Sequence, residues 1–219
     1  MKTALLFGAT GLVGGLLLRE LLADPTCERV TIVVRRPQPA PDARVAVVVA
    51  GMDTLESVRE QLVGDAVFLA IGTTRAKTPD RAEYARIDRD YPLHAARLAR
   101  ANGAGWAGLV SSVGADAGAS AFYLRTKGEA EQGLRALDFP SADVFRPGVL
   151  LGERAEHRPL ERALMAAASV TNALLPGPWS KYRAIPAQTV ARAMVVAARE
   201  RRPGFAIHHW RGMRAAAAG

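Results

Sequence analysis

Short apolar runs alternate along the chain with longer segments in which apolar residues recur at helical spacing. The runs expected to form strands cover residues 3–7, 30–34, 45–49, 66–71, 107–110, 142–146 and 204–208. The segments expected to form helices cover residues 12–22, 55–62, 81–101, 122–137, 160–173 and 189–199, with a kink expected at Pro92. The strand runs are apolar throughout, which is typical of parallel strands buried on both faces. The pattern predicts an α/β fold with a Rossmann-type, doubly wound parallel sheet.

No repeat or linker divides the chain, so residues 1–219 are expected to form a single domain. After Gly148 the pattern loosens, and residues 152–186 are first polar and later rich in Pro, Gly and Trp. Such a segment after the late strands of a doubly wound fold usually covers the substrate crevice. The alanine-rich residues 214–219 are expected to form a flexible tail.

A glycine-rich turn lies between the first predicted strand and the first predicted helix. It runs Gly8-Ala9-Thr10-Gly11-Leu12-Val13-Gly14. At this corner the glycines let the backbone approach a dinucleotide pyrophosphate, whose charge the free N–H groups of the helix N-terminus stabilise. The spacing G-x-x-G-x-x-G differs from the dehydrogenase G-x-G-x-x-G, and glycines at such corners can be purely structural. The position at the first corner favours a dinucleotide site.

The end of the second predicted strand indicates which dinucleotide is bound. A site that prefers NAD ends this strand with Asp or Glu, which accepts hydrogen bonds from the ribose 2′-hydroxyl. Here Val34 is followed by Arg35 and Arg36. Two guanidinium groups suit a 2′-phosphate, although a solvated arginine pair is the alternative. The sequence predicts NADPH, with Ile71 and Gly72 at the end of the fourth strand facing the same crevice.

Four residues suggest acid–base chemistry. Tyr123 and Lys127 are one helical turn apart on one face, and a lysine ammonium close to a phenol favours the phenolate. Ser111 and Ser112 end the preceding strand, where a hydroxyl can hydrogen-bond a substrate carbonyl. A lone Tyr-x-x-x-Lys pair is usually a surface pair. The order of glycine turn, serines and Tyr-x-x-x-Lys is far more specific.

This order resembles the short-chain dehydrogenase/reductase plan in its atypical branch. More narrowly, the chain resembles the Tat-interacting protein family of NADPH-binding reductase-like proteins from about residue 4 to about residue 200. The segments that carry the resemblance are LAIGTTR at 69–75, IDRDY at 87–91, SSVGAD at 111–116 and FRPGVLL at 145–151.

The resemblance implies a role for each matching residue at the cofactor. The implied cofactor-binding set is Gly8, Thr10, Gly11, Leu12, Val13 and Gly14 at the pyrophosphate, Arg35 and Arg36 at the 2′-phosphate, Ile71 and Gly72 along the adenosine, Lys127 at the nicotinamide ribose together with Tyr123, the proton donor, Leu150 at the carboxamide, and Arg158 from the covering segment. Ala50 stands where the family has an Asp that contacts adenine, and Asp53 could replace that Asp only if its loop curls back.

The resemblance also implies the catalytic residues. Tyr123 would donate the proton, and Lys127 would favour its phenolate. Either Ser111 or Ser112 would complete the set: the spacing to Tyr123 favours Ser111, and analogy with the wider superfamily favours Ser112. Asp88, Arg89 and Asp90 are interpreted as a charge network on a helix face.

Composition limits the other function classes. The formal net charge of +8 raises the question of a nucleic-acid partner, but the arginines are dispersed and never form a block with interleaved aromatic residues, so none is expected. Cys27 and the four histidines lack metal-ligand spacing, so no metal is expected. No apolar stretch reaches the roughly 18 residues of a membrane span. The apolar N-terminal run is broken at Gly8, which is atypical of a signal peptide, and the expected location is cytoplasmic.

The function predicted from these features is an NADPH-dependent oxidoreductase of the short-chain type. It would transfer a hydride to a carbonyl-type small molecule, using the Ser/Tyr/Lys set. The alternative is an NADPH-binding regulatory or redox-sensing protein that acts through a protein partner.

Overall fold

The computed structural model describes residues 1–152 and 175–218. One parallel sheet runs through it in the order β3-β2-β1-β4-β5-β6-β9. Its strands are β1 (Thr3–Phe7), β2 (Arg29–Val34), β3 (Val45–Val49), β4 (Ala66–Leu69), β5 (Trp106–Val110), β6 (Ser141–Phe145) and β9 (Gly204–His208). The order reverses between β1 and β4, as in a doubly wound Rossmann fold. The predicted fold class is confirmed.

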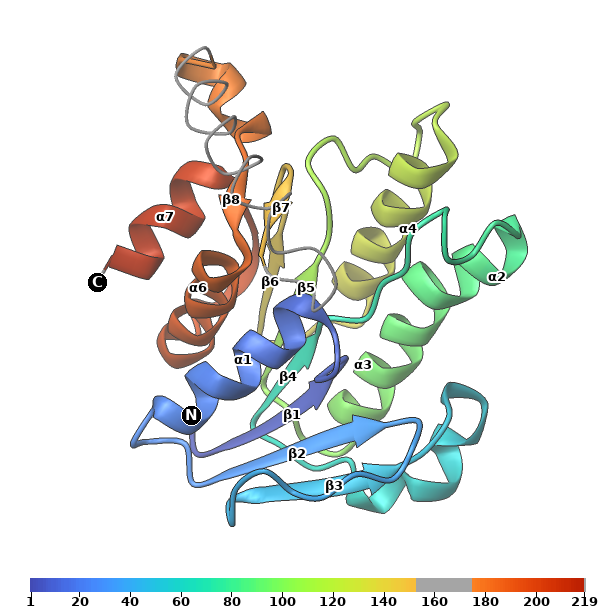
Figure 1. Cartoon of the computed structure of the whole chain (residues 1–219), viewed down its shortest axis with the longest axis vertical. Coiled ribbons are helices and arrows are strands. Elements are labelled where there is room, and N and C mark those ends of the chain that lie inside the picture. The colour runs from blue at the N-terminus through green and yellow to red at the C-terminus, as the bar shows by residue number, and fades with distance from the viewer. Residues whose placement is uncertain (153–174, 219) are drawn as a thin grey trace.

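Helices cover both faces of this sheet (Figure 1). On one face lie α1 (Leu12–Ala23), α6 (Ala187–Glu200) and α7 (Trp210–Ala218). On the other lie the 3₁₀ helix η1 (Met52–Gln61), α3 (Tyr91–Ala101) and α4 (Phe122–Ala136). In β1 the side chains alternate between these layers: Ala4 and Leu6 join the first core, while Leu5 and Phe7 join the second. Both layers are apolar, which is why the strand runs are apolar throughout.

The predicted helix over residues 81–101 is not one regular helix. It consists of α2 (Arg81–Ala85), a π-helical turn η2 (Arg86–Asp90) and α3. Pro92 lies in the first turn of α3, where a missing N–H is tolerated. The irregularity therefore precedes the proline, and π turns of this kind are frequent at functional sites.

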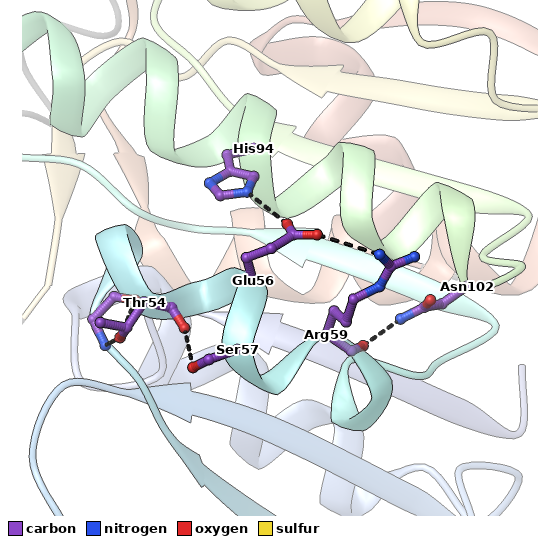
Figure 2. Close-up of polar contacts among 7 residues, drawn as sticks. Thr54, Glu56, Ser57, Arg59, His94 and Asn102 are labelled. Carbon is purple, nitrogen blue, oxygen red and sulfur yellow. Dashed lines mark hydrogen bonds and ion pairs between the residues drawn. The ribbon is translucent and has the colours of Figure 1, made fainter.

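Polar side chains connect η1 to the neighbouring helix α3 (Figure 2). Glu56 lies between Arg59 and His94, with the closest oxygen–nitrogen distances 3.4 and 3.5 Å. The Asn102 side-chain amide donates to the carbonyls of Arg59, at 2.6 Å, and Leu62, at 2.9 Å. These contacts hold the outer helices together above the core that η1 and α3 share.

The segment after β6 contributes short elements outside the main sheet. β7 (Leu150–Leu151) pairs in parallel with β8 (Ile185–Pro186), and η3 (Gly177–Tyr182) precedes β8. Residues 153–174, which include the predicted helix 160–173 and Arg158, lie outside the described residues.

The C-terminal residues differ from the expected flexible tail, because residues up to 218 form α7. Met213 is fully buried in the core shared with α1 and α6. The Trp210 indole donates to the Ala184 carbonyl at 3.2 Å, and the Arg183 and Arg214 guanidinium groups lie over its ring. The alanine run suggests a tail because it has no large apolar side chain, but the anchoring residues lie at its start.

The burial of Met213 gives a test of the α7 packing. Met213→Ala should lower the free energy of unfolding by about 2–5 kcal/mol, because it leaves a cavity in the core. The matched substitution Arg214→Ala, on the exposed side of the same helix, should cost about 1 kcal/mol or less. Urea denaturation of both variants measures the difference; equal costs would show that α7 is not packed on the core.

Candidate functional site

The glycine turn lies at the point where the strand order reverses. Gly8 has a φ of +88°, and a Cβ added there would lie 2.5 Å from the Ala70 carbonyl oxygen at the end of β4. A Cβ on Gly14 would overlap the Gly8 carbonyl. The Gly11 N–H donates to the same carbonyl at 2.8 Å and closes the turn. Both Gly8 and Gly14 are therefore required by the close approach of backbone to backbone.

The start of α1 fits a pyrophosphate. The helix begins at Leu12 with no side-chain cap and no acidic residue in its first turn, so its first N–H groups are free to bind an anion. Thr10 and Gly11 are exposed at this corner, whereas Val13 and Gly14 are buried and offer only backbone. Glycine spacing, helix terminus and exposure together match a dinucleotide cradle.

Arg35 and Arg36 follow β2 at the same edge of the sheet. Both side chains are exposed, and neither forms a salt bridge within the residues that the structure describes. Ala50 lies beside them, because its N–H donates to the Val34 carbonyl at 3.0 Å. Asp53 does not take the place of the missing Asp: its carboxylate pairs with Arg86 at 2.7 Å.

A buried ion pair holds the lysine of the Tyr-x-x-x-Lys motif. The Lys127 Nζ lies 2.6 Å from Asp88 Oδ1, and the two side chains are only 7% and 1% exposed. The second Asp88 oxygen accepts the Thr73 N–H at 2.9 Å. A Cβ on Gly72 would lie 3.5 Å from Asp88 Oδ1 and 3.8 Å from Lys127 Nζ, so the end of β4 reaches this pair directly. The structure thus brings Gly72 and Lys127 together.

Tyr123 is more accessible than the neighbouring Tyr84. Its side chain is about one third exposed, at the start of α4. The Tyr84 ring packs edge-on against it with the ring centroids 6.3 Å apart. Burial, followed by the charge of Asp88, raises the pKa of Tyr84 well above its usual range. Tyr84 therefore stays a neutral phenol.

The backbone around residue 116 sets the position of α4. A Cβ on Gly128 would overlap the backbone of Asp116 and Ala117, so only glycine lets the helix pack this close. The Asp116 N–H also donates to the Leu124 carbonyl at 3.1 Å. These contacts place the first turn of α4, with Tyr123, beside the loop that follows the two serines.

The two serines have different environments. Ser111 is buried and donates a short hydrogen bond to Glu131, which is also ion-paired with Arg146. Ser112 is half-buried, and its hydroxyl makes only a long contact of 3.4 Å with the Val113 carbonyl. The Ser112 hydroxyl is therefore the freer of the two to bind a substrate carbonyl.

Three side chains form ion pairs next to the predicted site residues that the sequence pattern does not predict: Asp88 with Lys127, and Glu131 with Arg146. Arg89 and Asp90 do form the predicted surface network, reaching Glu129, but Asp88 does not belong to it. The helical spacing does indicate that Asp88 is buried. Asp88 follows Tyr84 by one helical turn and precedes Pro92 by another, and Tyr84 and Pro92 are both buried. A charged residue on an apolar stripe must find a partner.

The segment after β6 returns to the glycine turn. A Cβ on Gly152 would lie 2.7 Å from the Leu12 side chain, so residues 150–152 pass close to the start of α1. Leu150 is half-buried there and packs against the core that α1 shares. Arg158 lies outside the described residues.

Fold and site define a Rossmann-type dinucleotide-binding protein. Residues 8–201 match a family model described as NAD(P)H-binding, and the chain belongs to this family. The chain is 37% identical to protein HTATIP2 of Rattus norvegicus over 201 residues, which cover 89% of this chain and 80% of that protein. It is 36% identical to the mitochondrial protein fmp52 of Emericella nidulans over 169 residues, covering 74% and 72%. The resemblance to the Tat-interacting protein family is confirmed.

Solved structures share the fold at low sequence identity. MoeE5 in complex with UDP-glucose and NAD superposes with a TM-score of 0.70 at 19% identity, covering 94% of this chain and 74% of that one. The dTDP-glucose 4,6-dehydratase DesIV from Streptomyces venezuelae, with NAD and TYD bound, gives a TM-score of 0.69 at 16% identity, covering 94% and 75%. At these identities the likeness supports the Rossmann fold alone.

The predicted cytoplasmic location is wrong on this comparison. The fungal relatives, including FMP52 of Saccharomyces cerevisiae at 36% identity over 157 residues, are named mitochondrial proteins. The prediction rested on the absence of a secretory signal, which does not bear on mitochondria. None of the described helices is long and apolar enough to cross a membrane.

The Lys127–Asp88 pair can be tested by stability. Asp88→Asn removes the carboxylate charge and leaves a buried ammonium uncompensated, which should cost about 3–5 kcal/mol of unfolding free energy. Asp90→Asn, two residues away in the same π turn, breaks only a partly exposed pair and should cost about 1 kcal/mol or less. Chemical denaturation compares the two, and a small cost for Asp88→Asn would contradict the assignment.

Proposed function

We propose that this protein is an NADPH-dependent reductase of the atypical short-chain dehydrogenase/reductase type, acting on a carbonyl-type small molecule. The observation that carries the proposal is the contact of Gly72 with the Lys127–Asp88 pair, at the sheet edge that also holds the glycine turn. A buried lysine fixed one turn below an accessible tyrosine, beside a dinucleotide cradle, suits proton transfer next to a bound nicotinamide.

The residues divide the chemistry among them. NADPH, when bound, supplies the hydride. The Ser112 hydroxyl donates a hydrogen bond to the substrate carbonyl oxygen and polarises it. Tyr123 gives its phenolic proton to that oxygen, and the Lys127 ammonium favours the phenolate left behind. Asp88 holds Lys127 in place, and Glu131 with Arg146 fixes Ser111 behind the reacting hydroxyls.

NADPH, rather than NADH, is the cofactor of this proposal. Arg35 and Arg36, at the end of β2, form no salt bridge with any described residue, and the last residue of that strand is Val34 rather than an acid. Guanidinium groups bind phosphate oxygens through two parallel hydrogen bonds and offer nothing comparable to a neutral ribose hydroxyl. The proposed preference for NADPH over NADH therefore rests on the positive charge of Arg35 and Arg36.

Removing the Tyr123 hydroxyl tests the enzyme assignment. Tyr123→Phe should lower turnover with a panel of aldehydes, ketones and quinones about 100-fold to 10,000-fold, the usual contribution of a general acid. The ring and its packing on Tyr84 remain, so NADPH should still bind. NADPH oxidation and fluorescence titration measure the two quantities.

Matched serine variants refine the same assay. Ser112→Ala should impair turnover more than Ser111→Ala, because the Ser111 hydroxyl is engaged by Glu131. NADPH binding without turnover, together with an unaltered phenotype of Tyr123→Phe in cells, would instead support the regulatory protein that acts through a partner.

Charge removal tests the cofactor. The double variant Arg35→Ala/Arg36→Ala should lower the affinity for NADPH by on the order of 100-fold, because it loses charge-assisted hydrogen bonds worth about 1.5–3 kcal/mol each. Its affinity for NADH should change little. Calorimetric titration with both nucleotides measures the ratio, and equal weakening would contradict the preference for NADPH.

A further inference from the structure

The carboxyl ends of β5, β6 and β9 form a row next to the proposed active site. Val110, Phe145 and His208 are in register across these strands. The next residues continue the pairing, because the Ser111 N–H donates to the Phe145 carbonyl at 2.8 Å and the Arg146 N–H to the His208 carbonyl at 2.9 Å. His209 therefore follows at the end of the third strand, roughly 10 Å from Ser111 by ordinary strand spacing.

A pocket of about 420 Å³ opens beside His209. It lies between η3 and the start of α7, and its lining residues are Gly177, Pro178, Ser180, Lys181, His209 and Arg211. Two of them are permanent cations and none is acidic. Within the described residues, neither Lys181 nor Arg211 forms a salt bridge, although Lys181 lies 5.2 Å from the Tyr182 ring centre.

His209 contributes an unpartnered ring nitrogen to the residues that line this pocket. Its Nδ1 atom is buried and has no hydrogen-bond partner among the described residues. Burial, followed by the charges of Arg146 and Lys181, lowers its pKa below the ordinary value. A neutral imidazole can present an N–H at Nδ1, and a buried donor without a partner costs free energy until a ligand accepts its hydrogen bond.

The Glu131 carboxylate, which acts on His209, does not cancel these cations. Glu131 lies close enough to His209 to affect its charge, but it is already bound by the Arg146 guanidinium and by the Ser111 hydroxyl. The pocket thus keeps an excess of positive charge in a concave site, which attracts anions.

We propose that this pocket, formed by Lys181, His209 and Arg211, binds an anionic group, carboxylate or phosphate, on the substrate whose carbonyl is reduced at Tyr123. The inference rests on the proposed function and names its substrate class. The common row of strand ends supplies the geometry: a substrate anchored at His209 extends along that row toward the serines and Tyr123. Lys181 and Arg211 supply the charge, and the His209 imidazole supplies a directed hydrogen bond.

A binding experiment tests the pocket independently of turnover. The protein is saturated with NADPH, so that Arg35 and Arg36 are occupied, and is then titrated with malonate, inorganic phosphate and the neutral malonamide. Malonate or phosphate should raise the melting temperature in a dose-dependent manner, and malonamide should not. The variant Lys181→Gln/Arg211→Gln should weaken anion binding at least tenfold, since each charged hydrogen bond is worth about a factor of ten or more.

A control variant distinguishes the effect of the pocket residues on anion binding from the effect of the net charge of the protein. Arg19→Gln/Arg192→Gln removes the same charge from exposed positions on α1 and α6 and should bind anions as the wild type does. Equal loss in both double variants, or equal effects of malonate and malonamide on the wild type, would overturn the proposal.

A kinetic comparison links the pocket to the reaction. With 2-carboxybenzaldehyde and its methyl ester as paired substrates, Lys181→Gln/Arg211→Gln should raise KM for the acid at least tenfold and leave KM for the ester within twofold. Equal changes in KM for both would overturn the substrate class. Should no member of the carbonyl panel, these two aldehydes included, be reduced, the proposed function fails, whereas the binding experiment still decides whether the pocket takes anions.

Discussion

The reversal of strand order between β1 and β4 is the constraint on which the rest of the molecule depends. The chain leaves β1 and β4 in opposite directions at this point, which forms the crevice. The ends of these two strands lie so close together that a Cβ on Gly8 would overlap the Ala70 carbonyl. The backbone of Gly72 then continues to the buried Asp88–Lys127 pair. A larger residue at Gly8 would therefore disturb the cradle and, through the end of β4, the position of the lysine.

The two buried charged residues of α4 are better explained by how they orient neighbouring groups than by a contribution to the free energy of unfolding. Lys127 and Glu131 lie one turn apart on the same face, and each is paired with a residue from another element, Asp88 and Arg146. Removing two charges from water costs several kcal/mol per ion, and apolar side chains of similar size often hold helices as well or better. What an ion pair adds is direction: one pair fixes the Lys127 nitrogen beside Gly72, and the other holds the Glu131 carboxylate that accepts a hydrogen bond from the Ser111 hydroxyl.

The sequence predicted the sheet and the glycine turn because both depend on local pattern. Continuous apolar runs require burial on both faces, and the glycines lie at the first corner of such a fold. Asp88 could not be placed in the same way, since its partner is 39 residues further on in Lys127 and the π turn η2 sets its direction. For α7 the alanine run concealed the anchor, because Met213 and Trp210 contact elements distant in sequence. The positions of Asp88 and α7 depend on contacts between residues far apart in the sequence, and the local pattern does not predict such contacts.

The positions of the cations in the structure suggest a different kind of partner from the one that the net charge alone suggests. As a bulk number, +8 suggests a polyanionic partner. In the structure, the carboxylates nearest the proposed crevice, Asp88 and Glu131, are neutralised by ion pairs. Exposed cations that form no salt bridge among the described residues follow β2 at Arg35 and Arg36 and β4 at Arg75 and Lys77, and Lys181 and Arg211 line the pocket beyond β9. An edge that carries cations while its buried carboxylates are paired suits small anionic molecules, as the proposed phosphorylated dinucleotide and acidic substrate would be.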